Sequence, residues 1–340
     1  MTALIQIENV SKRFVKRVDV AGKIANLLGA HNREQIVRAV DDVSLTIKQG
    51  EVLGLVGESG CGKSTLGRMV AGIMQPTAGR ILYEGRARED SNAARQVADA
   101  LAVQMIFQDP MASLNPRMRI EDIIGEAPIV HGLISKAEQR DYVAQIMRKV
   151  GLDPALMQRF PHQFSGGQRA RIGIARALAV KPKVLVCDEA VAALDVSIQA
   201  QVLNLFMELR AEMNLTYLFV SHDLSVIRHI ADRVAVMYLG RLVELADTDT
   251  LFQQPAHPYT RALLEELPRI DVRKKKFASL KGEVPSPLHP PSGCHFHPRC
   301  PQADAACRAT RPALIEVGAA HEAACLYPQT GGALPEPMSQ

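Results

Sequence analysis

Hydrophobic residues occur in short runs and in helically spaced sets along most of the chain, from residue 1 to about residue 265. A continuous apolar run at 52–56 has the length and composition of a buried strand. A glycine-rich segment follows it, and then an apolar set at helical spacing. The inward positions predicted for this helix are Leu66, Met69, Val70 and Ile73.

The same order of strand and helix returns later in the chain. The run from Val184 to Cys187 predicts a second buried strand, and it ends in two acidic residues. The amphipathic helix predicted after it turns inward Ile198, Val202, Leu205, Phe206 and Leu209. A third run, Thr216 to Val220, ends in Ser221 and His222. Alternating strands and helices predict a mixed α/β domain over 1–265 with a largely parallel sheet.

Two parts of the chain depart from this alternation. Residues from about 110 to 163 carry helical patterns and several prolines but no strong strand, which predicts a helical subdomain at about 110–180. After residue 265 the composition shifts to prolines and cysteines, so we expect a linker and a small appended module over 266–340. The basic run from Arg273 to Lys276 in this linker is interpreted as a solvated segment, with lipid or nucleic-acid binding as the alternative.

Composition places the chain among ordinary globular proteins. Its 340 residues are 47% hydrophobic and 22% charged, which excludes a disordered or collagenous chain. The formal charge of +4 is too small to demand a nucleic-acid partner. The sequence has no apolar stretch long enough to span a bilayer and no signal-peptide pattern at its start, so we expect a cytosolic location.

The segment from Gly57 to Ser64 has the pattern of a phosphate-binding loop, G-x-x-x-x-G-K-S, between the first buried strand and its helix. Its glycines allow backbone N–H groups to point at phosphate oxygens, and the helix N-terminus reinforces this field. Lys63 is predicted to reach the β- and γ-phosphates, and the Ser64 hydroxyl to coordinate magnesium. A glycine-rich turn without a ligand is the alternative. The predicted nucleotide contacts here are Gly57, Glu58, Ser59, Gly60, Cys61, Gly62, Lys63, Ser64 and Thr65.

Two acidic residues end the second buried strand. We predict that Asp188 holds the magnesium ion bridging the β- and γ-phosphates. Glu189 is then placed to act on the attacking water, as a general base or by orienting it. Adjacent acids after a strand are also typical of a turn or a helix cap. Cys187 before them is expected to be a buried strand residue, and Cys61 a small side chain within the loop.

A second glycine-rich turn, Ser165-Gly166-Gly167-Gln168, begins another helix, whose predicted inward positions are Ile172, Ala175 and Leu178. Such a helix start is a potential second anion site. One phosphate loop and one spare anion-binding helix start suggest that each nucleotide is closed over by another subunit.

At these motifs the sequence resembles the ATP-binding-cassette (ABC) ATPases, whose signature is LSGGQ-like, with Phe164 here in place of leucine. The resemblance implies a P-loop NTPase cassette with a helical subdomain. It implies that Phe14 stacks on adenine, although an aromatic near the first strand is often a core residue. Gln108 looks like the Q-loop residue that senses magnesium and touches the permease. His222 looks like the switch histidine at the γ-phosphate, and 193–195 like the D-loop between subunits.

Within this family the chain is most similar to ATPase subunits of dipeptide, oligopeptide and nickel importers. The strings 193–204 and 107–116, and the ending from His257, carry this likeness. One departure is DEAVAALD, with Ala190 and Ala192 where family members usually have proline and serine. Both acids remain, so we still expect hydrolysis.

Four of the six cysteines lie in the last fifth of the chain: Cys294, Cys300, Cys307 and Cys325. Their spacing lacks paired C-x2-C knuckles, and four thiolates suit zinc or an iron–sulfur cluster equally. The subgroup resemblance implies a 4Fe–4S cluster on these four residues, with zinc or free thiols as alternatives. The neighbouring His295, His297 and His321 are expected at the surface and not as ligands.

The resemblance implies an ATP-hydrolysing subunit that energises a membrane importer of di- or oligopeptides, at the cytoplasmic face of the bacterial inner membrane. Its implied partners are two permease subunits, a second ABC ATPase that is a paralogue more often than an identical copy, and an extracytoplasmic substrate-binding protein. No nucleic acid is expected. The alternatives are a soluble ABC ATPase acting on DNA or ribosomes, which usually has coiled coils, zinc hooks or two cassettes, and an exporter ATPase.

Overall fold

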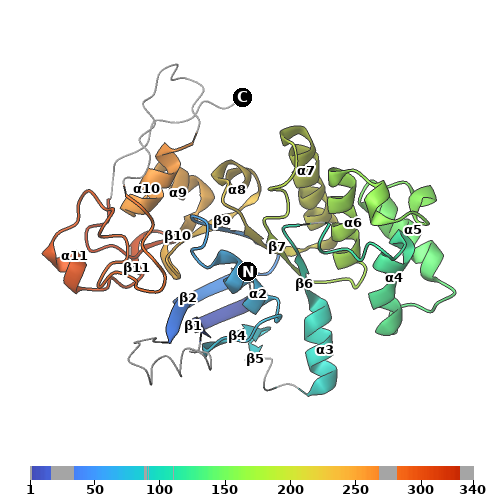
Figure 1. The fold of residues 1–340 in the computed structure, drawn as a ribbon, viewed down its shortest axis with the longest axis horizontal. Coiled ribbons are helices and arrows are strands. Elements are labelled where there is room, and N and C mark those ends of the chain that lie inside the picture. The colour runs from blue at the N-terminus through green and yellow to red at the C-terminus, as the bar shows by residue number, and fades with distance from the viewer. Residues whose placement is uncertain are drawn as a thin grey trace, which may run out of the picture.

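The computed structural model describes residues 2–16, 34–87, 90, 92–109, 111–267 and 282–329. The run from Arg273 to Lys276 lies outside these residues. The described strands form two sheets, one of eight strands and one of four (Figure 1).

The larger sheet carries the functional motifs. In spatial order its strands are β11 (Ile315–Gly318), β12 (His321–Ala323), β10 (Arg241–Asp247), β9 (Arg233–Tyr238), β3 (Val52–Val56), β8 (Thr216–Val220), β7 (Val184–Asp188) and β6 (Val103–Ile106). The five strands from β9 to β6 are parallel, as predicted, and β10, β12 and β11 add antiparallel strands at one edge. Because β3, β7 and β8 are parallel, the loops that follow them meet at one edge of the sheet.

The smaller sheet is antiparallel and was not anticipated from the alternation of strands and helices. Its spatial order is β2 (Gln35–Lys48), β1 (Ala3–Lys16), β4 (Ala78–Tyr83) and β5 (Arg86–Ala87). Buried residues of β1 and β2, among them Ile5 and Ile47, share one hydrophobic cluster with Leu66 and Met69 of the helix after β3. This sheet therefore packs against the helix that begins at the phosphate loop.

The helices cover the larger sheet and extend beyond it. They are α2 (Lys63–Val70), α3 (Ala93–Ala102), α4 (Ile120–Val130), α5 (Gln139–Lys149), α6 (Gly166–Leu178), α7 (Val196–Met213), α8 (Leu224–Ile230), α9 (Thr248–Gln253), α10 (Pro258–Glu265) and α11 (Ala305–Ala309), with short 3-10 turns η2 (Pro154–Leu156) and η3 (Pro161–Gln163). Helices α4, α5 and α6 stand together at one end of the molecule (Figure 1). Within 111–163 the structure has helices and no strand, as predicted.

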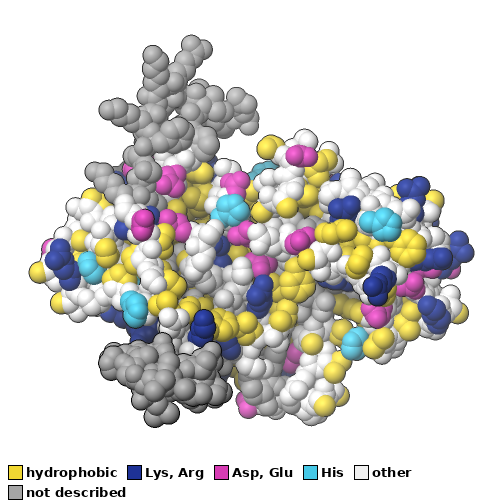
Figure 2. All heavy atoms as spheres, in the orientation of Figure 1, with side chains coloured by type: hydrophobic (Ala, Val, Ile, Leu, Met, Phe, Trp, Pro, Cys, Tyr) yellow, Lys and Arg dark blue, Asp and Glu magenta, His cyan; other side chains and the backbone are white. Residues whose placement is uncertain are grey.

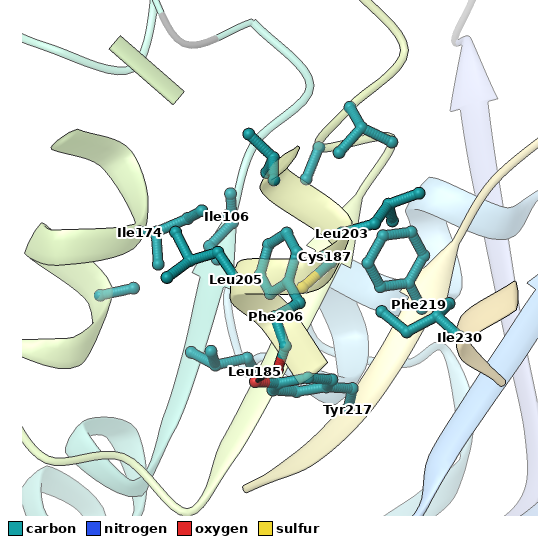
Figure 3. Close-up of a cluster of buried hydrophobic side chains, with 14 of the residues drawn as sticks. Ile106, Ile174, Leu185, Cys187, Leu203, Leu205, Phe206, Tyr217, Phe219 and Ile230 are labelled. Atoms are coloured by element: carbon teal, nitrogen blue, oxygen red, sulfur yellow. Dashed lines mark hydrogen bonds between the residues drawn. The ribbon is translucent and has the colours of Figure 1, made fainter. Parts of the chain in front are cut away.

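The core around α7 confirms the second predicted helix. Phe206 makes edge-on contacts with Tyr217 and Phe219 of β8, with ring centroids 5.7 and 5.6 Å apart (Figure 3). The Tyr217 hydroxyl donates to the Phe206 carbonyl at 2.8 Å, so its polar atom is satisfied within the core. Four of the five predicted inward residues of α7 are buried, and Ile198 is partly buried.

The predicted inward position of Ile73 is wrong, because α2 ends at Val70 and Ile73 is 56% exposed. The other three predicted residues of this helix are buried. Gly72 has a φ of 76°, a left-handed conformation that ends helices. The helical spacing of apolar residues in the sequence therefore continues about one turn beyond the end of the helix.

The C-terminal segment is not simply appended to the cassette. Strand β12 pairs with β10, with Glu244 opposite Ala323, and β11 pairs with β12. The open edge of β10 thereby finds hydrogen-bond partners in the extension. Within the described part of the chain, no helix has both the length and the apolarity to cross a membrane.

Candidate nucleotide-binding site

The predicted phosphate loop joins β3 to α2 and lies against neighbouring backbone. Gly57 and Gly62 have φ values of 148° and 107°. A Cβ atom on Gly57 would lie 2.1 Å from the Met237 carbonyl oxygen, and one on Gly62 would lie 2.0 Å from that of Ala39. Only glycine allows the loop to approach this closely.

Lys63 is folded over the loop that it follows. Its Nζ donates to the carbonyl oxygens of Gly57 at 2.7 Å and Glu58 at 3.0 Å. The residue is buried, whereas Ser59 and Gly60 at the tip of the loop are exposed. The ammonium group of Lys63 is thus held within the loop. Thr65 lies after the loop, in the first turn of α2.

Ser64 and Asp188 meet across the end of the sheet. The Ser64 hydroxyl donates to Asp188 Oδ1 at 2.7 Å. Burial raises the pKa of Asp188, while the hydrogen bond from Ser64 opposes this shift. A hydroxyl and a carboxylate in contact supply hard oxygen donors, the type that magnesium prefers. The two predicted magnesium ligands from separate motifs therefore fit such an ion.

Glu189 contacts residues from two other loops. Gln108 Nε2 donates to Glu189 Oε2 at 2.7 Å, and His222 Nδ1 lies 3.2 Å from Oε1. These three residues follow β6, β7 and β8, whose carboxyl ends meet at this edge. Glu189 has a φ of 49°, and its N–H donates to the Val220 carbonyl at 3.0 Å, which fixes this unusual backbone conformation.

Phe14 lies on β1 and is 40% exposed, so it does not belong to the buried core. Lys12 Nζ lies 5.6 Å from the centroid of its ring. An exposed aromatic face is what the predicted adenine contact requires.

The segment 165–168 forms the start of α6. Ser165 caps this helix, since its hydroxyl accepts from the Gln168 N–H and its own N–H donates to the Gln168 side chain. A Cβ on Gly167 would lie 2.5 Å from the Ile198 side chain, and one on Gly166 would lie 3.9 Å from Leu194. The signature-like turn thus adjoins the D-loop-like segment at the start of α7. Ile172, Ala175 and Leu178 are buried, as predicted.

The four C-terminal cysteines line one small cavity of about 20 Å³, together with His257, Phe296 and His297. Burial raises the pKa of Cys294, Cys300 and Cys325, the last to about 11. No group of three or more His, Cys, Asp or Glu side chains among the described residues is arranged to hold a metal ion. The structure brings the predicted ligands to one cavity but does not show a formed metal site.

The surface location predicted for His321 is wrong. It is buried, and its Nε2 lies 2.7 Å from Oε1 of the fully buried Glu244. The same carboxylate accepts from the N–H groups of Ala256 and His257. The burial follows from the pairing of β12 with β10. His295 and His297 are partly buried.

Two residues at the phosphate loop were missed by sequence reasoning. Arg299 donates to both carboxylate oxygens of Glu58, at 2.7 and 3.0 Å. The Glu58 N–H donates to the Tyr259 hydroxyl oxygen at 2.9 Å. Arg299 stands 241 positions after Glu58, and no motif of the sequence links them. Both residues bring the C-terminal part of the chain to the loop.

The fold and these motifs define an ATP-binding cassette, and the chain belongs to the ABC transporter family. Residues 40–192 match the family model "ABC transporter". Residues 243–307 match the model "Oligopeptide/dipeptide transporter, C-terminal region". The chain thus belongs to the branch of this family formed by oligopeptide and dipeptide transport ATP-binding proteins.

Similar proteins support this placement over most of the chain. The oligopeptide transport ATP-binding protein AppF of Bacillus subtilis is 50% identical, over 85% of this chain and 89% of its own. OppF of Salmonella typhimurium is 51% identical over 85% and 88% of the two chains. The di/tripeptide transport ATP-binding protein DppF of Pseudomonas aeruginosa is 51% identical over 82% and 86%. These relatives favour the transport prediction over the nucleic-acid alternative.

Solved structures agree on the fold. CbiO1 of Clostridium perfringens, part of the ABC transporter complex cbiONQ, is 26% identical with a TM-score of 0.60, over 74% of this chain and 91% of its own. The ATP-binding cassette MJ0796, a dimer bound to ADP and phosphate, is 25% identical with a TM-score of 0.61, over 72% and 99%. The predicted cassette fold is confirmed.

Proposed function

We propose that this protein hydrolyses ATP at the edge of its larger sheet to energise the import of di- or oligopeptides through a membrane permease. The observation that carries the proposal is the arrangement around Glu189. This carboxylate contacts Gln108 and His222, next to the contact between Ser64 and Asp188. Family membership and the oligopeptide-type C-terminal region support the choice of transport substrate.

In this proposal each residue has a separate task. The loop backbone and Lys63 bind the triphosphate, and Phe14 stacks on the adenine. Ser64, Asp188 and Gln108 would hold a magnesium ion, which would neutralise negative charge on the phosphates. Glu189 accepts a proton from the attacking water, and His222 orients that water and the γ-phosphate.

A second cassette completes the site. Ser165, Gly166, Gly167 and Gln168 lie at a helix start that can bind the γ-phosphate of a nucleotide held by a partner. As this partner we propose a paralogous ABC ATPase in preference to a second copy of this chain. ATP closes the two cassettes, and hydrolysis releases them.

The helical part of the chain offers a docking place for the permease. A cavity of about 480 Å³ lies along α4, and its lining includes Arg117, Lys136 and Val130. Val130 is 71% exposed. Figure 2 shows basic and hydrophobic side chains together over α4, α5 and α6. Such a mixed surface suits cytoplasmic helices of two permease subunits, at the cytoplasmic face of the inner membrane.

The C-terminal cavity is proposed to hold a 4Fe–4S cluster on Cys294, Cys300, Cys307 and Cys325. Four thiols facing one cavity are the donor set of such a cluster. A bound cluster would stabilise a segment that has few aromatic residues and many prolines. The alternative is zinc on the same four thiols, and analysis of the bound metal distinguishes zinc from iron.

The test of the transport function is to purify tagged Glu189→Gln protein from mild-detergent membrane extracts with magnesium and ATP. Mass spectrometry then identifies the proteins that stay attached. The expected result is that two multi-span permeases are attached, with or without a sister ATPase. Their genes would then point to the gene of the substrate-binding protein. A soluble homodimer, or one carrying nucleic acid or ribosomes, would contradict the transport function.

A further inference from the structure

We infer that Arg299 of the C-terminal extension is a positioning residue for ATP binding, which neutralises and holds Glu58 in the phosphate loop. The inference rests on the proposed function, because it assigns to the extension a part in the same nucleotide site.

The contact between the two residues is partly buried and bidentate. Arg299 is 4% exposed in its side chain, and two of its nitrogens reach the two carboxylate oxygens of Glu58. This geometry is the strongest form of an Arg–carboxylate pair. An arginine guanidinium stays protonated in proteins, so Arg299 supplies a full positive charge to this pair.

Two aromatic rings lie against the guanidinium. Its central carbon lies 5.8 Å from the ring centroid of Tyr238 and 6.0 Å from that of Phe296. Tyr238 also packs against Tyr259, whose hydroxyl accepts from the Glu58 N–H. The backbone and the side chain of Glu58 are therefore both fixed by residues outside the loop.

Charge explains why the pair matters for ATP. Glu58 follows Gly57 directly in a loop that must accept the negative charge of a triphosphate. An unpaired carboxylate here would repel the nucleotide. Arg299 removes this repulsion without occupying the exposed tip of the loop.

The extension also contacts the segment that is hydrogen-bonded to Cys61 in the loop. His295 Nδ1 lies 3.2 Å from the carbonyl oxygen of Leu239. The next residue, Gly240, donates its N–H to the Cys61 carbonyl at 2.8 Å. Phe296 and Arg299 lie in the segment between Cys294 and Cys300, so the packing around the cysteine cavity and the packing around the loop share residues.

The test measures binding of a non-hydrolysable ATP analogue with magnesium to the purified full-length chain. We expect Arg299→Met to weaken binding about tenfold, the equivalent of one unfavourable charge near the phosphates. We expect Glu58→Gln, introduced into Arg299→Met, to restore most of the lost affinity. We also expect added salt to reduce the defect of the single variant.

The matched control is Arg311→Met, which removes an arginine of the same extension that pairs with Asp42 of β2 and not with the loop. It should bind the analogue as the parent does. If Arg299→Met does not fold, Arg299→Gln, which keeps a polar head, decides in the same way. Thermal unfolding is measured for each variant, so that a loss of folding is told apart from a loss of binding.

The outcomes separate this inference from the proposed function. Parent-like binding by Arg299→Met, or a double variant as weak as the single one, would overturn the inference. Lys63→Ala is the reference for the site itself. If Lys63→Ala also binds the analogue like the parent, the proposed nucleotide site is wrong. If Lys63→Ala binds weakly and Arg299→Met binds like the parent, only the role of Arg299 is wrong.

Discussion

His222 Nδ1 lies 3.2 Å from Glu189 Oε1, although the two residues come from different loops. Each follows a parallel strand, β8 and β7, and these strands are neighbours in the sheet. The contact is a consequence of topology, because the carboxyl ends of neighbouring parallel strands share one edge. It gives the Glu189 carboxylate a side-chain partner from the neighbouring loop.

Glu189→Gln is expected to lower ATP turnover by about 100-fold or more, since a general base contributes that much to proton transfer. ATP binding should be retained, because Glu189 is assigned to the water and not to the nucleotide. Phosphate release and size-exclusion chromatography with ATP test this, with a closed dimer as the expected state. Glu208→Gln, an exposed acid of α7, is the control. Undiminished turnover in Glu189→Gln would refute the assignment.

Lys63→Ala should act on binding instead. Loss of a charge-assisted contact to phosphate is expected to weaken ATP affinity about 30-fold. Equilibrium titration with nucleotide and magnesium measures the effect. Lys63→Ala should bind ATP more weakly than Glu189→Gln does. Equal ATP affinities of these two variants would show that one of the two assignments is wrong.

The loop glycines provide a matched pair. Gly60 and Gly62 both have positive φ, but a Cβ on Gly60 meets no atom within 4 Å, whereas one on Gly62 meets backbone. Gly60→Ala should therefore cost about 1 kcal/mol of stability, from conformation alone. Gly62→Ala should cost about 3 kcal/mol, because strain and a steric clash add. Thermal and denaturant unfolding measure both, and equal losses would contradict the packing argument.

Sequence patterns predicted the parallel strands β3, β7 and β8, because each is a continuous apolar run followed by polar or glycine residues. They failed where structure depends on distant pairing. The burial of His321 follows from the pairing of β12 with β10, and Arg299 reaches Glu58 only in the folded chain. The roles of Gln108 and His222 came from the family resemblance, since neither residue forms a motif by itself.

The cysteine cavity leads to a prediction about composition. Protein purified without oxygen should be brown and contain about four irons and four sulfides per chain, as a cubane requires. Cys307→Ser should lose both colour and iron, whereas Cys187→Ala should keep them, because Cys187 lies in β7 within the core. Colourless protein that contains zinc would decide for the alternative metal.

A substitution at the cavity along α4 tests permease binding separately from ATP hydrolysis. Val130 is exposed at this cavity and is not among the residues assigned to the nucleotide site, so Val130→Glu should leave ATP turnover of the isolated chain unchanged. Burying a new negative charge where Val130 would contact the permease should nevertheless lower the yield of permease complex about tenfold. The matched control is Ile315→Glu, an exposed apolar residue of β11 at the opposite edge of the sheet. Co-purification from membranes compares the two. Loss of complex with both variants would mean that α4 has no special role, and loss with Val130→Glu alone would identify this cavity as the surface through which hydrolysis is coupled to transport.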